Sequence, residues 1–197
     1  KTGAMIREIT AGGAERPRRR MLIVPEQYSH RTERALCEAG GPELSLYAEV
    51  FSFTGLARRV FSEAGGVSSG YLDDGGRLLV MYSALQKVRQ GLNVYGRAAG
   101  NPEFIRSLIA SVDEMKTCGV TAGELTRLSE QVDFSGKLSE LAAILEAYEA
   151  LTAQGKLDPR DMLSLAAERM AGCTFGVDAD IYFDSFTDFT VPELELL

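Results

Sequence analysis

The carboxylate of Asp184 is the first group in this chain whose position suggests chemistry. It directly follows a short apolar run, Ile181-Tyr182-Phe183. Ligands bind beyond the carboxyl ends of parallel strands, so a buried strand here would deliver this carboxylate to a binding edge, where it could hold a magnesium ion. The alternative is a strand-end aspartate that caps a turn. A working ATPase of this kind carries a glutamate next, but here Ser185 follows, and a serine cannot act as the general base. Nucleotide turnover is therefore expected to be poor.

The first two residues, Lys1 and Thr2, match the end of a phosphate-binding loop. In such a loop the lysine reaches the terminal phosphates and the hydroxyl of the following residue binds magnesium. Met5, Ile6 and Ile9 follow at helical spacing, as the motif requires. Two residues alone fit a charged, frayed terminus equally well. Lys1 and Thr2 are thus candidate nucleotide-binding residues only in combination with the aspartate near the other end.

Aromatic and basic side chains occur together in the segment that begins at Val50. Phe51 and Phe53 precede Arg58 and Arg59. Aromatic faces stack on exposed bases and arginines pair with phosphates, so this combination suits single-stranded nucleic acid. The same pattern also fits two phenylalanines in the core and two arginines on a solvated helix face.

A second group of polar residues follows the first apolar run of the chain. Gln27, Tyr28 and Ser29 would lie at the same sheet edge and could form hydrogen bonds with bases. Alternatively Ser29 caps the next helix, with Thr32 in its first turn. A basic loop precedes that run and is expected to be a solvated turn. It contains Arg16, Arg18, Arg19 and Arg20.

Composition excludes several classes of site. The net charge of −7 argues against a strong, nonspecific polyanion binder, although a local basic patch remains compatible with it. A zinc site is not expected, because the only histidine is His30 and the cysteines Cys37, Cys118 and Cys173 are widely separated. Reduced thiols in a cytoplasmic protein are expected instead. The apolar runs are too short for a bilayer, which needs roughly 20 residues, so no membrane contact is expected.

Hydrophobic patterning predicts an α/β fold with a parallel sheet. Helices are expected over 1–10, 29–39 and 53–64, and strands over 21–25 and 44–51. From about Asp73 to Gly172 nearly everything reads as helix, with apolar stripes over 104–115 and 138–148. Asn101-Pro102 predicts one helix start, and the capping box of Thr121 and Glu124 predicts another. Strand character returns only at Asp180, before a further helix that begins near Thr190.

The simplest architecture is a parallel-sheet, P-loop-type core with a large all-α insertion. Residues 1–66 would form the first part of the core, 67–179 the helical insertion, and 180–197 the resumed core. Both ends read as edges of a fragment, because the chain starts inside a motif and stops inside a helix.

These motifs, in this order, resemble the N-terminal helicase-like region of the AddB (RexB-type) subunit of bacterial ATP-dependent helicase–nucleases, a superfamily 1 helicase-like protein. The resemblance covers the whole chain. The matching segments are Lys1-Thr2, Val24–Gln27, Phe51–Val60 with Glu63–Gly66, Glu114–Val120, Leu157-Asp158, and Asp184–Thr190 with Glu193.

The resemblance implies a core like helicase domain 1A and an insertion like domain 1B, in a subunit whose motor machinery has degenerated. An AddA-like partner subunit would supply the motor in a heterodimer. A nuclease domain and an iron–sulfur cluster would lie outside this fragment. The helicase-like half would scan the unwound single strand for a recombination hotspot, Chi, during double-strand break repair.

The resemblance carries specific roles to specific positions. The hotspot-reading surface would include Gln27, Ser29, Phe53 and Phe186, and we add Tyr28, Arg58 and Arg59 as candidate DNA-binding residues. Asp184 is the candidate metal ligand.

Four positions depart from the family pattern. Gly55 stands where some relatives carry arginine, and Arg58 where some carry tryptophan. Two expectations follow and stay open: a different sequence is read, or recognition is weak. Ser185 stands where glycine is usual, and Val191 where proline is usual, with Pro192 one place later.

The sequence therefore predicts a non-motor module that binds and scans single-stranded DNA. The fragment is not expected to be catalytic by itself, and ATP and Mg²⁺ are expected only as weak or vestigial ligands. Two alternatives stay open: an active ATP-dependent DNA helicase fragment, and a nucleotide-binding or structural interaction module without DNA contact.

Overall fold

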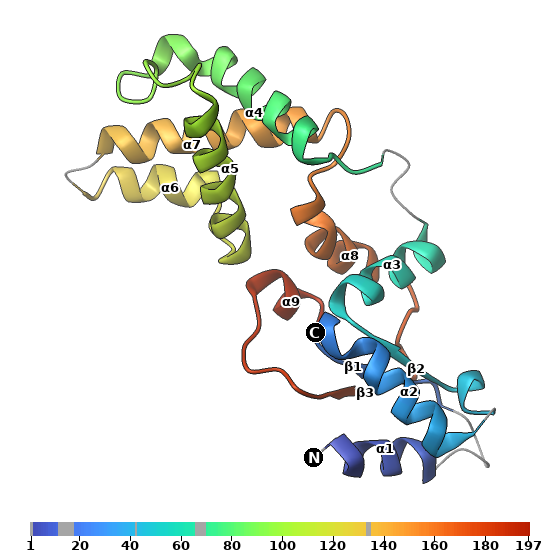
Figure 1. The fold of residues 1–197 in the computed structure, drawn as a ribbon. Helices are drawn as coiled ribbons and strands as arrows, with labels where there is room; N and C mark the ends of the chain where they lie inside the picture. Colours follow the sequence, from blue (N-terminus) through green and yellow to red (C-terminus); the bar gives the residue numbers. More distant parts are fainter. Residues whose placement is uncertain (1, 12–17, 42, 66–69, 133–134) are drawn as a thin grey trace. The chain divides into compact units, whose positions relative to one another are not determined.

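A computed structural model describes residues 2–11, 18–41, 43–65, 70–132 and 135–197 (Figure 1). The chain divides into two compact units, which are treated separately. The sheet unit comprises residues 1–66, 163–189 and 193–197, and the helical unit comprises 67–162 and 190–192.

The sheet unit is built on three short parallel strands, β1 (Arg20–Ile23), β2 (Ala48–Phe51) and β3 (Asp180–Phe183). Their order is β2-β1-β3, so β1 is central and is paired on both sides. Arg20 lies opposite Ala48 in one neighbour and Asp180 in the other. All four residues of β1 are buried, which is why this strand reads as a continuous apolar run rather than an alternating one. The predicted α/β class with a parallel sheet is confirmed.

Four helices belong mainly to the sheet unit: α1 (Thr2–Ala11), α2 (Ser29–Gly40), α3 (Phe53–Ala64) and α8 (Met162–Met170). Ile6 and Ile9 of α1 pack with Leu22 of the central strand and Leu36 of α2. Ser52 caps α3, since its hydroxyl accepts the backbone N–H of Gly55 at 3.1 Å.

Two details of the sheet unit differ from the pattern-based expectation. The predicted strand 44–51 is split into a 3₁₀ turn, η2 (Leu44–Leu46), and β2, because the ladder with β1 begins only at Ala48. Helix α8 lies in the sheet unit, whereas the sequence placed 163–179 in the insertion. Helical periodicity shows that a face is apolar but not which unit it packs against.

The helical unit contains α4 (Asp74–Val88), α5 (Pro102–Thr117), α6 (Ala122–Ser129) and α7 (Ser135–Thr152), with 3₁₀ turns η3 (Arg89–Gly91) and η4 (Pro159–Asp161). Its core includes Leu108 and Val112 of α5 and Leu145 and Tyr148 of α7, as the two apolar stripes predict. The final short helix, α9 (Val191–Glu195), starts in this unit and ends in the sheet unit.

Predicted caps fix the helix ends of this unit. Thr121 and Glu124 form the capping box at the start of α6, and the Asn101 side chain accepts the N–H of Glu103 at the start of α5. The segment before α4 pairs with the segment after α7: Leu72 N–H donates to Leu157 O at 2.9 Å. No helix among the described residues is long and apolar enough to cross a lipid bilayer.

Candidate functional site

The carboxyl ends of all three strands converge on one edge of the sheet. The ladder extends one residue past the strands, with Val24 N–H bonded to Phe51 O at 2.9 Å and Asp184 N–H bonded to Ile23 O at 3.1 Å. These two bonds hold the three exit loops side by side. This is the edge at which parallel sheets bind ligands.

A cavity of about 570 Å³ lies at this edge. We call it the edge cavity. It is lined by residues 24–28 after β1, 52–54 after β2 and 185–188 after β3, together with Leu163 and Glu193. A volume of this size is typical of a site for a small molecule or a nucleotide base with its sugar.

The loop after β1 presents its side chains outward. Pro25 starts a single 3₁₀ turn, η1 (Glu26–Tyr28), closed by the Tyr28 N–H to Pro25 O bond at 2.8 Å. Gln27 and Tyr28 line the cavity and are exposed. Ser29 is not among the lining residues. The expectation that Ser29 caps α2 is wrong: it is the first helical residue, and its hydroxyl donates to Glu26 O at 2.5 Å.

An aromatic cluster forms one wall of the edge cavity. The rings of Phe53 and Phe186 are 5.4 Å apart and meet edge to face, and Phe186 stacks on Phe189 at 4.9 Å. Phe183 at the end of β3 contacts all three. Phe53 is only 5% exposed, whereas Phe186 is half-buried. Phe186 is therefore the ring that can offer a free face, with Phe53 packed behind it.

Phe189 is a member of this cluster that the sequence analysis did not single out. It follows Phe186 by three residues in a segment without helix or strand. The spacing of Phe183, Phe186 and Phe189 was the available signal. In an irregular loop, however, such spacing does not predict that rings meet.

Asp184 and Ser185 form the turn between β3 and the aromatic wall. Asp184 is 6% exposed, and its Oδ2 atom finds no hydrogen-bond partner in the described part of the chain. Ser185 has a φ of 66°, the only non-glycine residue with a positive φ in the described part of the chain. The left-handed conformation disfavours side chains. This conformation gives a physical reason for the glycine that resembling sequences usually carry there.

The nucleotide-binding candidates do not assemble into a site in the described residues. Lys1 lies outside them, and Thr2 starts α1 without lining the edge cavity. Within the described ranges, no group of three or more His, Cys, Asp or Glu side chains that could hold a metal ion occurs, around Asp184 or elsewhere.

The arginines predicted to bind DNA lie away from the cavity. Arg59 pairs with Glu63 at 2.8 Å and approaches Glu49 at 3.7 Å, while Arg19 binds the same two carboxylates. Arg58 is exposed on α3 and does not line the cavity. The described residues that line the cavity include no lysine, arginine or histidine. Three of them are acids: Glu26, Asp188 and Glu193.

The predicted basic loop is mostly engaged in structural contacts. The Arg20 guanidinium donates to the carbonyl of Ile9 and thereby ties α1 to the start of β1. Arg18 is exposed and only 3.8 Å from Asp180. Arg16 lies outside the described residues.

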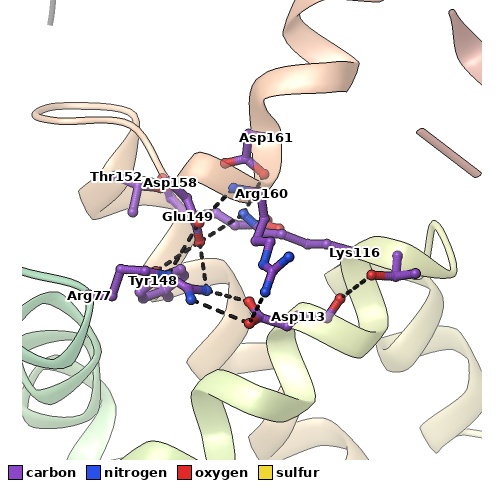
Figure 2. Close-up of polar contacts among 10 residues, drawn as sticks. Arg77, Asp113, Lys116, Tyr148, Glu149, Thr152, Asp158, Arg160 and Asp161 are labelled. Atoms are coloured by element: carbon purple, nitrogen blue, oxygen red, sulfur yellow. Dashed lines mark hydrogen bonds and ion pairs between the residues drawn. The ribbon is translucent and has the colours of Figure 1, made fainter. Parts of the chain in front are cut away.

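A second cluster of charged residues lies inside the helical unit (Figure 2). We call it the helical-unit network, and it joins α4, α5, α7 and η4. Tyr148 OH donates to Asp158 Oδ2 at 2.9 Å, and Arg77 Nε lies 3.3 Å from Asp158 Oδ1. The members are Arg77, Asp113, Lys116, Tyr148, Asp158, Arg160 and Asp161.

Burial and the charged neighbours shift the pKa values of several members of this network. Burial alone would raise the pKa of Asp158, but the Arg160 N–H, Lys116, Tyr148 and Arg77 outweigh it and lower that pKa. Burial and the neighbouring Asp158 charge raise the pKa of Tyr148. Burial also raises the pKa of Asp161, against the opposing effect of Lys116. Shifts of this kind arise at active sites and equally in structural ion-pair networks.

The bonding pattern favours the structural interpretation of the network. Asp158 is completely buried, and both of its oxygens are used: Oδ1 accepts the Arg160 N–H at 3.0 Å and Oδ2 accepts from Tyr148. Asp113 accepts from Arg77 through both oxygens, and its Oδ2 also accepts from Arg160 at 3.1 Å. Carboxylates whose oxygens are occupied in this way have little capacity left for a ligand.

Glu140 is a further buried acid with a structural role. Its carboxylate accepts the backbone N–H groups of Asn93, Val94 and Tyr95 at 2.6 to 3.1 Å. Burial would raise its pKa, but these three bonds lower it. The carboxylate thus fixes the loop after α4 onto α7.

Comparison with known proteins agrees with the family that the sequence motifs suggested. A family model described as ADDB, N-terminal matches residues 1–197. Similar proteins include the B subunits of the ATP-dependent helicase/deoxyribonucleases of Acetivibrio thermocellus, 32% identical over 90% of this chain, and of Heliobacterium modesticaldum, 33% identical over 90%. The corresponding protein of Geobacillus kaustophilus is 32% identical over the full chain. The matched region spans only 16%, 15% and 18% of these three relatives.

Proposed function

The chain belongs to the family of AddB N-terminal regions, and on that premise we propose that it is the strand-scanning, non-motor part of an AddB-type helicase–nuclease subunit. In this role it binds unwound single-stranded DNA and reads it for a recombination hotspot during double-strand break repair. The sheet unit corresponds to helicase domain 1A and the helical unit to domain 1B.

The edge cavity is the observation that carries this proposal. It brings together four residues that the sequence analysis selected from three separate segments: Gln27, Tyr28, Phe53 and Phe186. A half-buried aromatic ring stacks on a base, and an exposed amide and phenol form hydrogen bonds with base edges. The buried Phe53 acts indirectly in this arrangement, because it supports the ring of Phe186.

The same edge offers poor support for ATP hydrolysis. Asp184 is followed by Ser185, and the described residues contain no cluster of metal ligands. The arginine and lysine groups that would neutralise phosphates are absent from the described lining of the cavity. We therefore assign the motor to a partner subunit of AddA type, and the nuclease and any iron–sulfur cluster to parts of the AddB-type protein outside this chain.

The proposal is tested in the complete two-subunit protein with the variants Phe186→Ala and Gln27→Ala. Hotspot recognition, measured as pausing or attenuated cutting at the hotspot, is expected to fall about tenfold or more for Phe186→Ala, since base stacking contributes about 1–3 kcal/mol. Unwinding of hotspot-free DNA should continue at the wild-type rate.

Matched controls separate recognition from general damage. Leu46→Ala removes an 84%-exposed apolar side chain at the amino end of β2, and Gln90→Ala removes an exposed amide of the helical unit. Both should leave hotspot recognition unchanged. A normal hotspot response in both Phe186→Ala and Gln27→Ala would refute the proposed function.

A further inference from the structure

The charge of the edge cavity determines which part of a DNA strand can enter it. Three acids, Glu26, Asp188 and Glu193, line the cavity, and its described lining contains no cationic side chain. A phosphate brought against these carboxylates would be repelled. If a strand binds here, as the proposed function requires, its backbone runs outside the cavity and a base points inward.

The wall groups also determine what kind of base fits. An ionised carboxylate only accepts hydrogen bonds, so it needs a base edge with N–H donors. Thymine offers one such donor, N3–H. Guanine offers N1–H and the 2-amino group side by side, which match the two oxygens of one carboxylate. Adenine and cytosine each offer a single amino group.

Glu26 is the acid best placed to act in this way. Its carboxylate makes no hydrogen bond or ion pair with any described residue, whereas an oxygen of Asp188 already accepts the N–H of Phe189 at 2.8 Å. The 3₁₀ turn that closes on Pro25 fixes the backbone of Glu26 at the cavity wall, next to Gln27. Phe186 lines the same cavity.

We propose that the edge cavity selects guanine, and that Glu26 is the acceptor that determines this specificity. Phe186 supplies the stacking surface, which every base can use. Glu26 adds discrimination, because only guanine presents two adjacent donors, N1–H and the 2-amino group, to the two oxygens of its carboxylate.

The test uses the complete two-subunit protein without ATP and a set of thymidine oligonucleotides. Each oligonucleotide carries one deoxyguanosine, deoxyinosine or thymidine at a scanned position, and affinity is measured by competition. At the position that reaches the cavity, guanine should bind about tenfold more tightly than thymine, as a bidentate contact implies. Inosine lacks the 2-amino group and should fall between them.

The variant Glu26→Gln distinguishes base reading from simple repulsion. It should reduce the preference for guanine to about twofold or less, while affinity for the all-thymidine strand stays equal or rises. Glu38→Gln, which neutralises an exposed acid late in α2, is the matched control and should keep the full preference.

Two results would overturn this inference while leaving strand scanning intact. One is a wild-type protein that binds all oligonucleotides equally yet loses affinity with Phe186→Ala. The other is a Glu26→Gln variant that binds every oligonucleotide more tightly by the same factor, which is the behaviour of a purely electrostatic acid. Binding that is insensitive to both Phe186→Ala and Glu26→Gln would instead refute the proposed function itself.

Discussion

The edge cavity and the helical-unit network both bring together polar residues from distant parts of the chain. They differ in how far the hydrogen-bonding groups of these residues are satisfied within the protein. In the network, the buried carboxylate of Asp158 is surrounded by donors from Tyr148, Arg77 and the backbone of Arg160. In the edge cavity, the side chains of Glu26 and Gln27 are exposed. Asp184, the neighbour of the lining residue Ser185, has an Oδ2 atom without a hydrogen-bond partner among the described residues. The shifted pKa values of Tyr148 and Asp158 thus belong to a structural cluster, whereas the open polar side chains belong to the proposed functional site.

The comparison predicts its largest effect at Asp158. Replacing it with alanine leaves Arg77 and Lys116 buried without their shared partner, and removing one member of a buried ion pair costs about 3–5 kcal/mol. Chemical denaturation of the chain should show this loss in the free energy of unfolding. The exposed pair of Glu103 and Arg106 is the control, and Glu103→Ala should cost less than about 1 kcal/mol.

A small loss in Asp158→Ala, comparable to that of Glu103→Ala, would break the comparison. The network would then not be the main support of the helical unit, and a ligand-binding role for it would have to be reconsidered.

Glu140 should show the next largest effect. Glu140→Ala leaves the backbone N–H groups of Asn93, Val94 and Tyr95 without their shared acceptor, which should destabilise the helical unit by about 1–3 kcal/mol. Hydrogen exchange would locate the change, with faster exchange of these three amides. Unchanged protection at residues 93–95 would contradict the role assigned to this carboxylate.

Acid pH should weaken the helical unit through the same two carboxyls. Asp158 and Glu140 both have a folded-state pKa below the ordinary value near 4. Their stabilisation is fully present above the unfolded-state pKa and is lost as the pH falls through the folded-state pKa. The free energy of unfolding should therefore drop below about pH 4. The drop should be smaller in Glu140→Gln, and a drop equal to that of the wild type would show that Glu140 does not contribute.

The smallest predicted effect concerns Ser185 beside the edge cavity. Its φ of 66° strains an L residue, so Ser185→Gly should stabilise the chain by about 0.5 kcal/mol after the entropy of glycine in the unfolded state is counted. Ser62→Gly in the last turn of α3 should instead destabilise by about 0.5 kcal/mol. If Ser185→Gly is destabilising instead, the serine side chain makes a contact that stabilises the chain by more than the positive φ costs.

Much of the sheet unit could be predicted because its signals are local. One apolar run ends at Val24-Pro25 and another ends at Asp184. These runs predicted the two strands β1 and β3 and the sheet edge at which both end. The caps at Asn101 and Thr121 followed from residue types at fixed spacing. The sequence also predicted that the polar residues after the first strand and Phe186 after the last lie at one sheet edge, because parallel strands end at the same edge.

The contacts that sequence could not supply are those between distant residues without a periodic relation. Arg77 meets Asp158 across 81 positions, and nothing in either segment indicates the other. Arg59 was a candidate for DNA; its partner Glu63, four residues later on α3, could be read from the sequence, but Glu49 is brought to it only by the fold. The acidic lining around Glu26 was missed for the same reason, since its members come from separate loops.

The central claim, that an unwound strand passes over the edge cavity, is tested most directly by photocrosslinking. The complete two-subunit protein would be stalled on DNA whose unwound strand carries 5-iodouracil, which crosslinks to aromatic side chains that stack on it. We expect crosslinked peptides that contain Phe186 or Tyr28, and their loss in Phe186→Ala and in a Tyr28→Ala variant. Efficient crosslinks that map only elsewhere, with neither loop labelled at any position of the probe, would contradict the claim.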